Sequence, residues 1–339
     1  MKNKAQGRRQ KANGDWLKVI LQPSAFILGC ALALAAGAQQ YPNRSVRIIV
    51  PQAAGGGLDI SVRAVANKLT ETWGQQVVVD NRPGANGIIG VEMTAKSKPD
   101  GYTLGAAFTS VLTVNSSVYK SLPYDTFRDF APITQLVANT IVLVVNPHLP
   151  ARSVKELVAL GRSRPGDLAY GSFGIGNLTH LAGELLGIEG RLKMVHVPYK
   201  GETPAVTDLI AGQVALGFTT APGVAVHIKS GALRLLATCG EKRAIAYPGT
   251  PTMIEAGFPR FVVTGWSALV ATAGTPQEIV KKVSRDSARH VMSPELRERL
   301  SAIGAEPVAS TPEQFAAFIK SETEKWQAVV KAAGIYQSQ

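Results

Sequence analysis

The sequence predicts an α/β fold in which mostly parallel sheets are flanked by helices and two lobes face each other across a cleft. Short apolar runs alternate along the chain with segments that begin at helix-capping residues. Such alternation is typical of parallel strands covered by helices on both faces. Two of the runs also lead through a glycine-containing loop into a helix, at Val46–Asp59 and Ala169–Asn177. Because ligands in open α/β sheets bind at the carboxyl ends of strands, one loop from each lobe is expected to hold opposite ends of a solute.

Residues 1–38 have the pattern of a cleavable export signal. A basic segment is followed by the apolar run Phe26–Ala38, which ends in Ala36-Gly37-Ala38. This run is shorter than the roughly 20 apolar residues of a membrane-spanning helix. We therefore expect export to the periplasm and a mature protein that begins near Gln39.

Two other export routes remain open from the same segment. Cys30 lies in a loose lipoprotein-like context and is a candidate for acylation, although the apolar run continues past it. Arg8-Arg9 resembles a twin-arginine signal, but no bulky apolar pair follows.

Composition narrows the class of protein. Removing residues 1–38 takes away six Lys and Arg side chains and one Asp, so the formal net charge falls from +12 to +7. A mildly basic surface suits acidic solutes, and the absence of basic clusters interleaved with aromatics argues against nucleic acid. Without Cys30 only Cys239 remains, so the mature chain has no internal disulfide, and Cys239 is interpreted as a small core residue.

Nine apolar runs are predicted to be buried strands. They are Val46–Val50, Val77–Val79, Tyr102–Ala107, Ile141–Val145, Leu168–Gly171, Met194–Val197, Val214–Phe218, Leu233–Ala237 and Ala268–Ala271.

Helix start signals lie between these runs. Capping boxes are predicted at Ser153–Glu156, Thr275–Glu278 and Thr311–Gln314, the last two with proline at the first helical position. Ser293 precedes another helix. The last helix carries an amphipathic stripe from Phe315 to Val330.

The first glycine loop contains Gly55, Gly56 and Gly57, just before a helix that starts near Asp59. Glycine lets the backbone N–H groups turn toward a guest, and the start of a helix favours negative charge. The loop is therefore a candidate site for an anionic small molecule, while a tight turn that permits close packing is the alternative. Asp59 is expected to cap the helix, to receive a ligand ammonium or water, or to do both.

The second loop offers neutral hydrogen-bonding groups, which are Ser172, Asn177 and Thr179. His180 is interpreted as a partly buried helix residue rather than a ligand contact. Neither loop is a nucleotide site, because no Gly-Lys-Ser/Thr follows the first, and Gly84–Gly90 has the wrong glycine spacing for a dinucleotide.

Catalysis has no candidate residues in the sequence. It shows no nucleophile elbow, no paired carboxylates and no metal-ligand spacing, so neither an enzyme activity, a cofactor nor a metal is expected.

Several long segments resemble the Bug (TctC-like) extracytoplasmic solute receptors of tripartite tricarboxylate transporters. They are VRIIVPQAAGGGLDISVRAVANKL, VVVDNRPGANGIIGVEMTAKSKPDGYTL, SLPYDTFRDFAPIT, YGSFGIGNLTHLAGELL and HVPYKGETPAVTDLIAGQV, and the match runs from Tyr41 to Gly334. The resemblance implies a type II periplasmic-binding-protein architecture with a hinge. Lobe one would comprise 39–145 and 265–339, and lobe two 146–264.

The resemblance further implies a monomeric receptor, not an enzyme, that binds a small carboxylate and delivers it to integral membrane subunits. Backbone amides, hydroxyls and ordered waters would hold the ligand. The residues carried over to the site are Gln52, Ala53, Ala54, Gly55, Gly56, Gly57, Asp59, Thr109, Ser110, Ser172, Gly176, Asn177, Thr179, Tyr199 and Thr219, with Lys200 near the cleft floor.

The chain departs from the family pattern in three places. Gln52 stands where the family often has Phe or Trp, and Ala54 stands where it has Pro. Phe218 is followed by Thr219 rather than by the usual Asp. Loss of this acid favours plain di- or tricarboxylates over ligands that carry an amine.

Two other functions remain open. If its closed form docked on a two-component sensor kinase, the same receptor would act in sensing. Neighbouring genes for membrane subunits would favour transport instead. An exported hydrolase is the third possibility, which turnover of an ester or amide would revive.

Overall fold

The computed structural model describes residues 41–334, so the predicted export signal with Cys30 lies outside the described residues. Residues 44–334 lie within one compact unit. Among residues 41–334, no helix combines the length and the apolar character needed to span a membrane.

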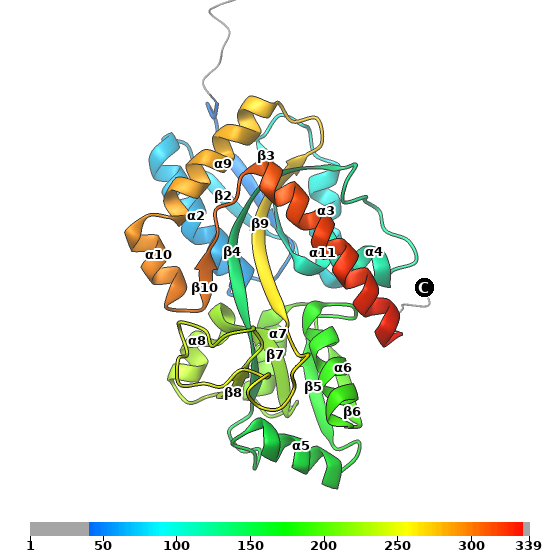
Figure 1. Ribbon diagram of the computed structural model, residues 1–339. Coiled ribbons are helices and arrows are strands. Elements are labelled where there is room, and N and C mark those ends of the chain that lie inside the picture. Colours follow the sequence, from blue (N-terminus) through cyan, green and yellow to red (C-terminus); the bar gives the residue numbers. More distant parts are fainter. Residues whose placement is uncertain (1–40, 335–339) are drawn as a thin grey trace, which may run out of the picture. The chain divides into compact units, whose positions relative to one another are not determined.

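The unit is built from short strands that alternate with helices, as Figure 1 shows. In chain order they are β1 (Val46–Val50), α2 (Gly57–Trp73), β2 (Val77–Asn81), η1 (Ala85–Gly87), α3 (Ile88–Ala95), β3 (Thr103–Phe108), η2 (Ser110–Val114), α4 (Asn115–Val118), β4 (Phe130–Val145), α5 (Val154–Ser163), β5 (Leu168–Ser172), α6 (Leu178–Gly190), β6 (Met194–Pro198), α7 (Glu202–Ile210), β7 (Leu216–Thr220), α8 (Ala221–Lys229), β8 (Arg234–Thr238), β9 (Thr264–Thr272), α9 (Gln277–Val291), α10 (Pro294–Ser301), β10 (Ala305–Pro307) and α11 (Pro312–Ala333).

The strands form one sheet with the order β2-β1-β3-β9-β4-β7-β5-β6, and β8 and β10 also pair with β4. Strands β1, β2 and β3 are parallel to one another, as are β5, β6 and β7. Antiparallel β4 and β9 connect these two groups. The predicted α/β fold with parallel strands flanked by helices is confirmed, and the structure adds the two antiparallel connectors.

Strand β4 changes partners along its length. Its first part, Phe130–Thr140, pairs with β9, and its last part, Ile141–Val145, pairs with β7. In Figure 1 the two long strands run from the group that contains α2 and α9 to the group that contains α5 and α6. The same strand therefore contributes to both halves of the sheet.

The core lies on both faces of this sheet. Its largest fully buried side chains include Trp266, Tyr170, Phe218 and Phe261. Such burial is the main favourable term in folding, at about 25 cal/mol per Å² of apolar surface. Cys239 is fully buried, which confirms its interpretation as a core residue.

All nine predicted apolar runs overlap strands, but the first part of β4 and the short β10 were not predicted. Pro132, Thr134 and Gln135 interrupt the apolar pattern of β4, and irregular register near these residues shifts the alternation of its side chains. A strand is recognised in a sequence by apolar residues at every second position, and this segment lacks that pattern.

The capping predictions had mixed outcomes. Thr311 and Gln314 form the full predicted capping box of α11, and Ser293 caps α10. Ser153 caps α5, but the Glu156 carboxylate accepts from the Arg152 amide instead of the Ser153 amide. The prediction for α9 was wrong, because Pro276 is its N-cap and the Thr275 hydroxyl donates to the Thr272 carbonyl.

Candidate ligand-binding site

A small cavity is lined by residues that follow β1 and β5, by residues at the ends of β3, α6 and β7, and by the connector strands β4 and β9. Its volume is about 30 Å³. None of the described residues that line it carries a charge; they are Gln52, Leu58, Phe108, Thr109, Ser110, Asn139, Ile141, Phe173, Asn177, Leu178, Thr179, Thr220, Gly265, Trp266 and Ser267. The cavity therefore has hydroxyl, amide and apolar groups to offer a guest.

Five of the predicted site residues line this cavity, namely Gln52, Thr109, Ser110, Asn177 and Thr179. The remaining predicted site residues are not among those that line it. The sequence did not point to Asn139, Trp266 or Ser267, because β4 and β9 bring them in from outside the two glycine loops.

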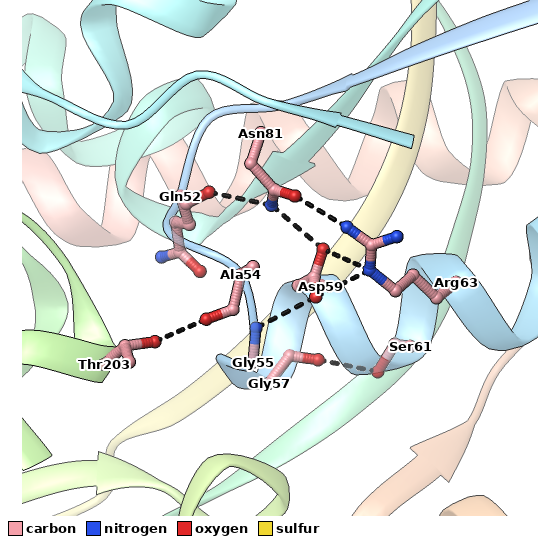
Figure 2. A network of polar contacts seen from close by, with 9 residues as sticks. All are labelled: Gln52, Ala54, Gly55, Gly57, Asp59, Ser61, Arg63, Asn81 and Thr203. Carbon is pink, nitrogen blue, oxygen red and sulfur yellow. Dashed lines mark hydrogen bonds and ion pairs between the residues drawn. The ribbon is translucent and has the colours of Figure 1, made fainter. Parts of the chain in front are cut away.

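The first glycine loop is held by its own polar network, which Figure 2 shows. The Gly55 amide donates to an Asp59 carboxylate oxygen at 2.9 Å. The same carboxylate is paired with Arg63 at 2.9 Å and accepts from the Asn81 amide at 2.9 Å. Asn81 also donates to the Gln52 carbonyl, so the loop is tied to β2.

Asp59 is not the N-cap of α2, as the sequence suggested. The helix begins at Gly57 with Gly56 as N-cap, and Asp59 lies in its first turn. Its side chain instead reaches back to the amide of Gly55, a position before the helix. Because Asp59 is buried with these protein partners, its carboxylate is committed to holding the loop.

The loop also contacts the start of α7. The Gly57 amide donates to the Glu202 carboxylate at 2.6 Å, and the Thr203 hydroxyl donates to the Ala54 carbonyl at 2.7 Å (Figure 2 shows the second bond). A Cβ on Gly57 would lie 2.3 Å from the Thr220 hydroxyl oxygen. These contacts support the alternative interpretation of the loop, in which glycine permits close packing.

The sequence predicted that the site lacks an acid at Thr219, but an acid from another element lies beside this residue. The Thr219 hydroxyl donates at 2.7 Å to the carboxylate of Glu202 on α7, so this carboxylate lies beside the position where the family has Asp. Burial raises the pKa of Glu202, while hydrogen bonds from Thr220, Thr219 and the Gly57 amide oppose that rise. The sequence missed Glu202 because it is distant in the chain from both loops.

The second loop is fixed mainly by neutral groups. The Asn177 side chain caps α6 by accepting from the Thr179 amide at 3.0 Å. The Leu178 amide donates to the Ser110 hydroxyl, also at 3.0 Å. No acidic residue lies in the first turn of α6, unlike that of α2.

Two stacked histidines, His180 and His196, contact polar groups of this loop. His180 accepts from the Gly176 amide, and His196 is 2.6 Å from the Ser172 hydroxyl. The two imidazole rings are 4.0 Å apart between centroids. Burial lowers the pKa of His196 to about 4, with a further contribution from His180, and burial also lowers the pKa of His180. His180 is thus the buried helix residue that the sequence suggested.

Asn86, which was not among the predicted site residues, links the second loop to α4. Asn177 donates to the Asn86 side chain at 2.7 Å, and Asn86 donates to Asn115 at 2.8 Å. Asn86 has a φ of 51° and lies between Gly84 and Gly87, which also have positive φ. Asparagine flanked by glycines is the signal that would have indicated this turn.

Tyr199 and Lys200 lie beside the cavity rather than in its wall. The Tyr199 hydroxyl donates to Asp208 at 2.8 Å, and Tyr199 is not among the residues that line the cavity. Lys200 is exposed and lines a smaller neighbouring cavity that also includes Gln52 and Asn177. Within residues 41–334, no group of three potential metal ligands occurs.

Residues 61–335 match the family model described as tripartite tricarboxylate transporter family receptor. The protein BugT of Bordetella pertussis is 39% identical over 310 residues, which cover 91% of this chain and 95% of BugT.

Solved structures agree with these relatives. The R. palustris protein Rpa4515 with adipate has a TM-score of 0.86 at 34% identity, over 87% of this chain and 99% of that one. The periplasmic binding protein BugD has a TM-score of 0.84 at 32% identity, over the same shares. MatC from Rhodopseudomonas palustris with bound malate has a TM-score of 0.81 at 27% identity, over 86% of this chain and 100% of that one.

Proposed function

Because this chain belongs to the family of tripartite tricarboxylate transporter receptors, we propose that it captures a small organic carboxylate in the periplasm and delivers it to membrane subunits. Adipate and malate in the related structures support the carboxylate class. The observation that carries the proposal is the uncharged polar cavity between the two glycine-loop regions. The receptor acts as a monomer.

The proposed lobes are residues 39–145 with 265–339, and residues 146–264. The change of partners within β4 supports a hinge near this strand, because its first part pairs with β9 and its last part with β7. Closure of the lobes buries the solute, and contacts made only in the closed form drive the closure.

Neutral groups suffice to hold a carboxylate in such a cleft. Hydroxyl groups such as those of Thr109 and Ser110 line the cavity, and ordered water can bridge them to the ligand at little energetic cost. A buried cation without a partner would cost far more. The predicted preference for di- or tricarboxylates depended on the absence of an acid at Thr219. Because the Glu202 carboxylate lies beside Thr219, that reason no longer applies.

Native mass spectrometry of protein purified from periplasm without refolding tests the proposal. We expect a retained carboxylic acid, and calorimetry should then show binding of that acid at micromolar or tighter affinity. A crystal structure with the guest away from the cavity of Thr109, Asn177 and Trp266 would overturn the proposed site. Failure of every carboxylate to bind would overturn the function.

A further inference from the structure

A second and larger cavity lies between α6 and α11. Its volume is about 330 Å³, against about 30 Å³ for the cavity beside the glycine loops. Pockets that hold small molecules usually measure about 300–1,000 Å³. We call it the α6/α11 groove, and Leu181, Leu185, Ile188, Lys325, Trp326 and Val329 form its two helical walls. The two cavities share none of the described residues that line them.

The lining of the groove is mostly apolar. Leu181, Leu185 and Ile188 are at positions i, i+4 and i+7 of α6, so they lie on one face of that helix. Val262 and Val263, just before β9, add further apolar surface. Ile188 is exposed, and covering such a side chain is favourable by about 25 cal/mol per Å² of apolar surface. An apolar chain is therefore a suitable occupant.

The groove carries charged groups whose exposed members are cations. Arg260 is 86% exposed, and its Nε lies 3.4 Å from the carboxylate of Glu189, which is 11% exposed. Lys325 is 43% exposed, and its Nζ lies 3.1 Å from the carboxylate of Glu322, which is 10% exposed. Two acids balance the two cations, but each acid is covered by its cation, so a solute approaching from water meets positive charge.

These cations are available to a ligand. An exposed ion pair contributes only about 0–1 kcal/mol, so the Arg260 and Lys325 side chains can turn from their acids toward another carboxylate at small cost. Their positions, on the segment before β9 and on α11, place one cation on each side of the apolar lining. The charge of the groove thus complements an anionic head group attached to an apolar chain.

The groove also spans the two proposed lobes. Helix α6 and Arg260 belong to residues 146–264, whereas α11 belongs to residues 265–339. Small-molecule sites occur preferentially at interfaces between domains and between helices. A ligand in the groove would contact both proposed lobes without entering the cavity of Thr109 and Asn177.

We propose that the α6/α11 groove is a second ligand site, which takes an aliphatic monocarboxylate with a long apolar chain. The chain packs between the apolar faces of α6 and α11, and the carboxylate meets Arg260 and Lys325 at the rim. This site goes beyond the proposed function and does not depend on which solute occupies the cavity beside the glycine loops.

Calorimetry with decanoate, hexanoate and 1-decanol, each below the concentration at which it aggregates, tests the ligand class. Decanoate should bind at least about tenfold more tightly than hexanoate, because four more methylene groups are covered. It should also bind about twofold or more tightly than 1-decanol, which has no charge. The double variant Arg260→Gln/Lys325→Gln should remove the advantage over 1-decanol.

A matched pair of variants tests the location. Ile188→Glu places an acid in the groove and should weaken decanoate binding at least about tenfold. Val226→Glu makes the same change at an exposed residue of α8 that does not line the groove, so decanoate should bind it as it binds the unmodified protein. Fluorescence gives a second readout, because 10-bromodecanoate should quench Trp326 and Trp326→Phe should remove most of the quenching.

Three results would overturn the proposal. The first is equal binding of decanoate and hexanoate, or no binding of either. The second is quenching that persists in Trp326→Phe, which would place the chain near another tryptophan. The third is a dimer in sedimentation that Ile188→Glu dissociates, since a second copy would then cover the groove. None of these results bears on the carboxylate proposed for the cavity beside the glycine loops, which the acid retained on purification tests separately.

Discussion

At the scale of single residues, the sequence predicted the two glycine loops but not the residues that contact them. Gly55 requires a positive φ of 83°, and a Gly-rich run after a strand indicates such a turn. The sequence contains no sign that Glu202 approaches Gly57, because the contact joins residues 145 positions apart. Five predicted residues line the cavity, whereas the contributions of Asn139 and Trp266 depend on strand pairing that the pattern did not determine.

Gly56→Asp tests the close approach of the loop to Glu202. Gly56 has φ −78° and ψ 167°, which any residue adopts, so the backbone tolerates the change. The new side chain would meet the Glu202 carboxylate within 2.9 Å, and two buried carboxylates repel. Calorimetry should show at least about a tenfold loss of affinity for the native ligand.

The matched control is Gly249→Asp, since a Cβ there has nothing within 4 Å and its φ is not positive. It should bind as the unmodified protein does. Combining Gly56→Asp with Glu202→Ala should restore part of the affinity. Full affinity in Gly56→Asp alone would contradict the geometry of the loop.

Cys239 is predicted to be inert in the folded protein. It is fully buried, and burial raises the pKa of its thiol, so little thiolate forms at neutral pH. In a Cys30→Ser variant, Ellman's reagent should detect no thiol under native conditions and one thiol in guanidinium chloride. Rapid native reaction would show that this part of the core opens readily.

At the scale of elements, the predicted strands and helices agree best with the structure where apolar residues repeat regularly. Strand β1 and helix α11 have such patterns and lie where expected. The first part of β4 lacks one, because its polar Thr134 and Gln135 are buried in the sheet and its register is irregular. Tertiary pairing with β9 decides its conformation, which local sequence does not reveal.

The loop between β5 and α6 is predicted to be sensitive to acid. Unfolded histidines protonate near pH 6.5, whereas the pKa of His196 in the fold is lowered to about 4. Between these values the unfolded chain binds more protons, so stability is full above about pH 6.5 and falls as pH falls toward 4. Protonation of His180 would also cost the bond from the Gly176 amide.

Thermal melting between pH 7 and pH 4.5 measures this effect. Between pH 7 and pH 4.5, the melting temperature of the unmodified protein should fall by at least about 3 °C more than that of a His196→Gln variant. His148→Gln is the control, because His148 is exposed and is not part of the stacked pair. Identical pH profiles for His196→Gln and the unmodified protein would contradict the role of the histidines.

At the scale of the whole unit, the cavity is far smaller than the solute proposed for it. Its volume of about 30 Å³ is about that of one water molecule in the liquid. A carboxylate such as adipate is several times larger, so the proposed lobes must separate before a solute enters. Bonds that join them include Gly57 to Glu202, Ala54 to Thr203, Asn86 to Asn177 and Tyr119 to Ile175. These contacts involve protein groups alone and therefore stabilise closure without a ligand.

Small-angle scattering can show whether closure precedes binding. We expect the ligand-free protein to populate the closed form, and the double variant Glu202→Ala/Thr203→Val to have a larger radius of gyration, because two bonds between the proposed lobes are lost. Ligand should compact the double variant and change the unmodified protein little. Glu156→Ala is the control, since Glu156 contacts Arg152 within the same proposed lobe. Equal compaction of both proteins by ligand would show that these bonds form only after the solute has bound.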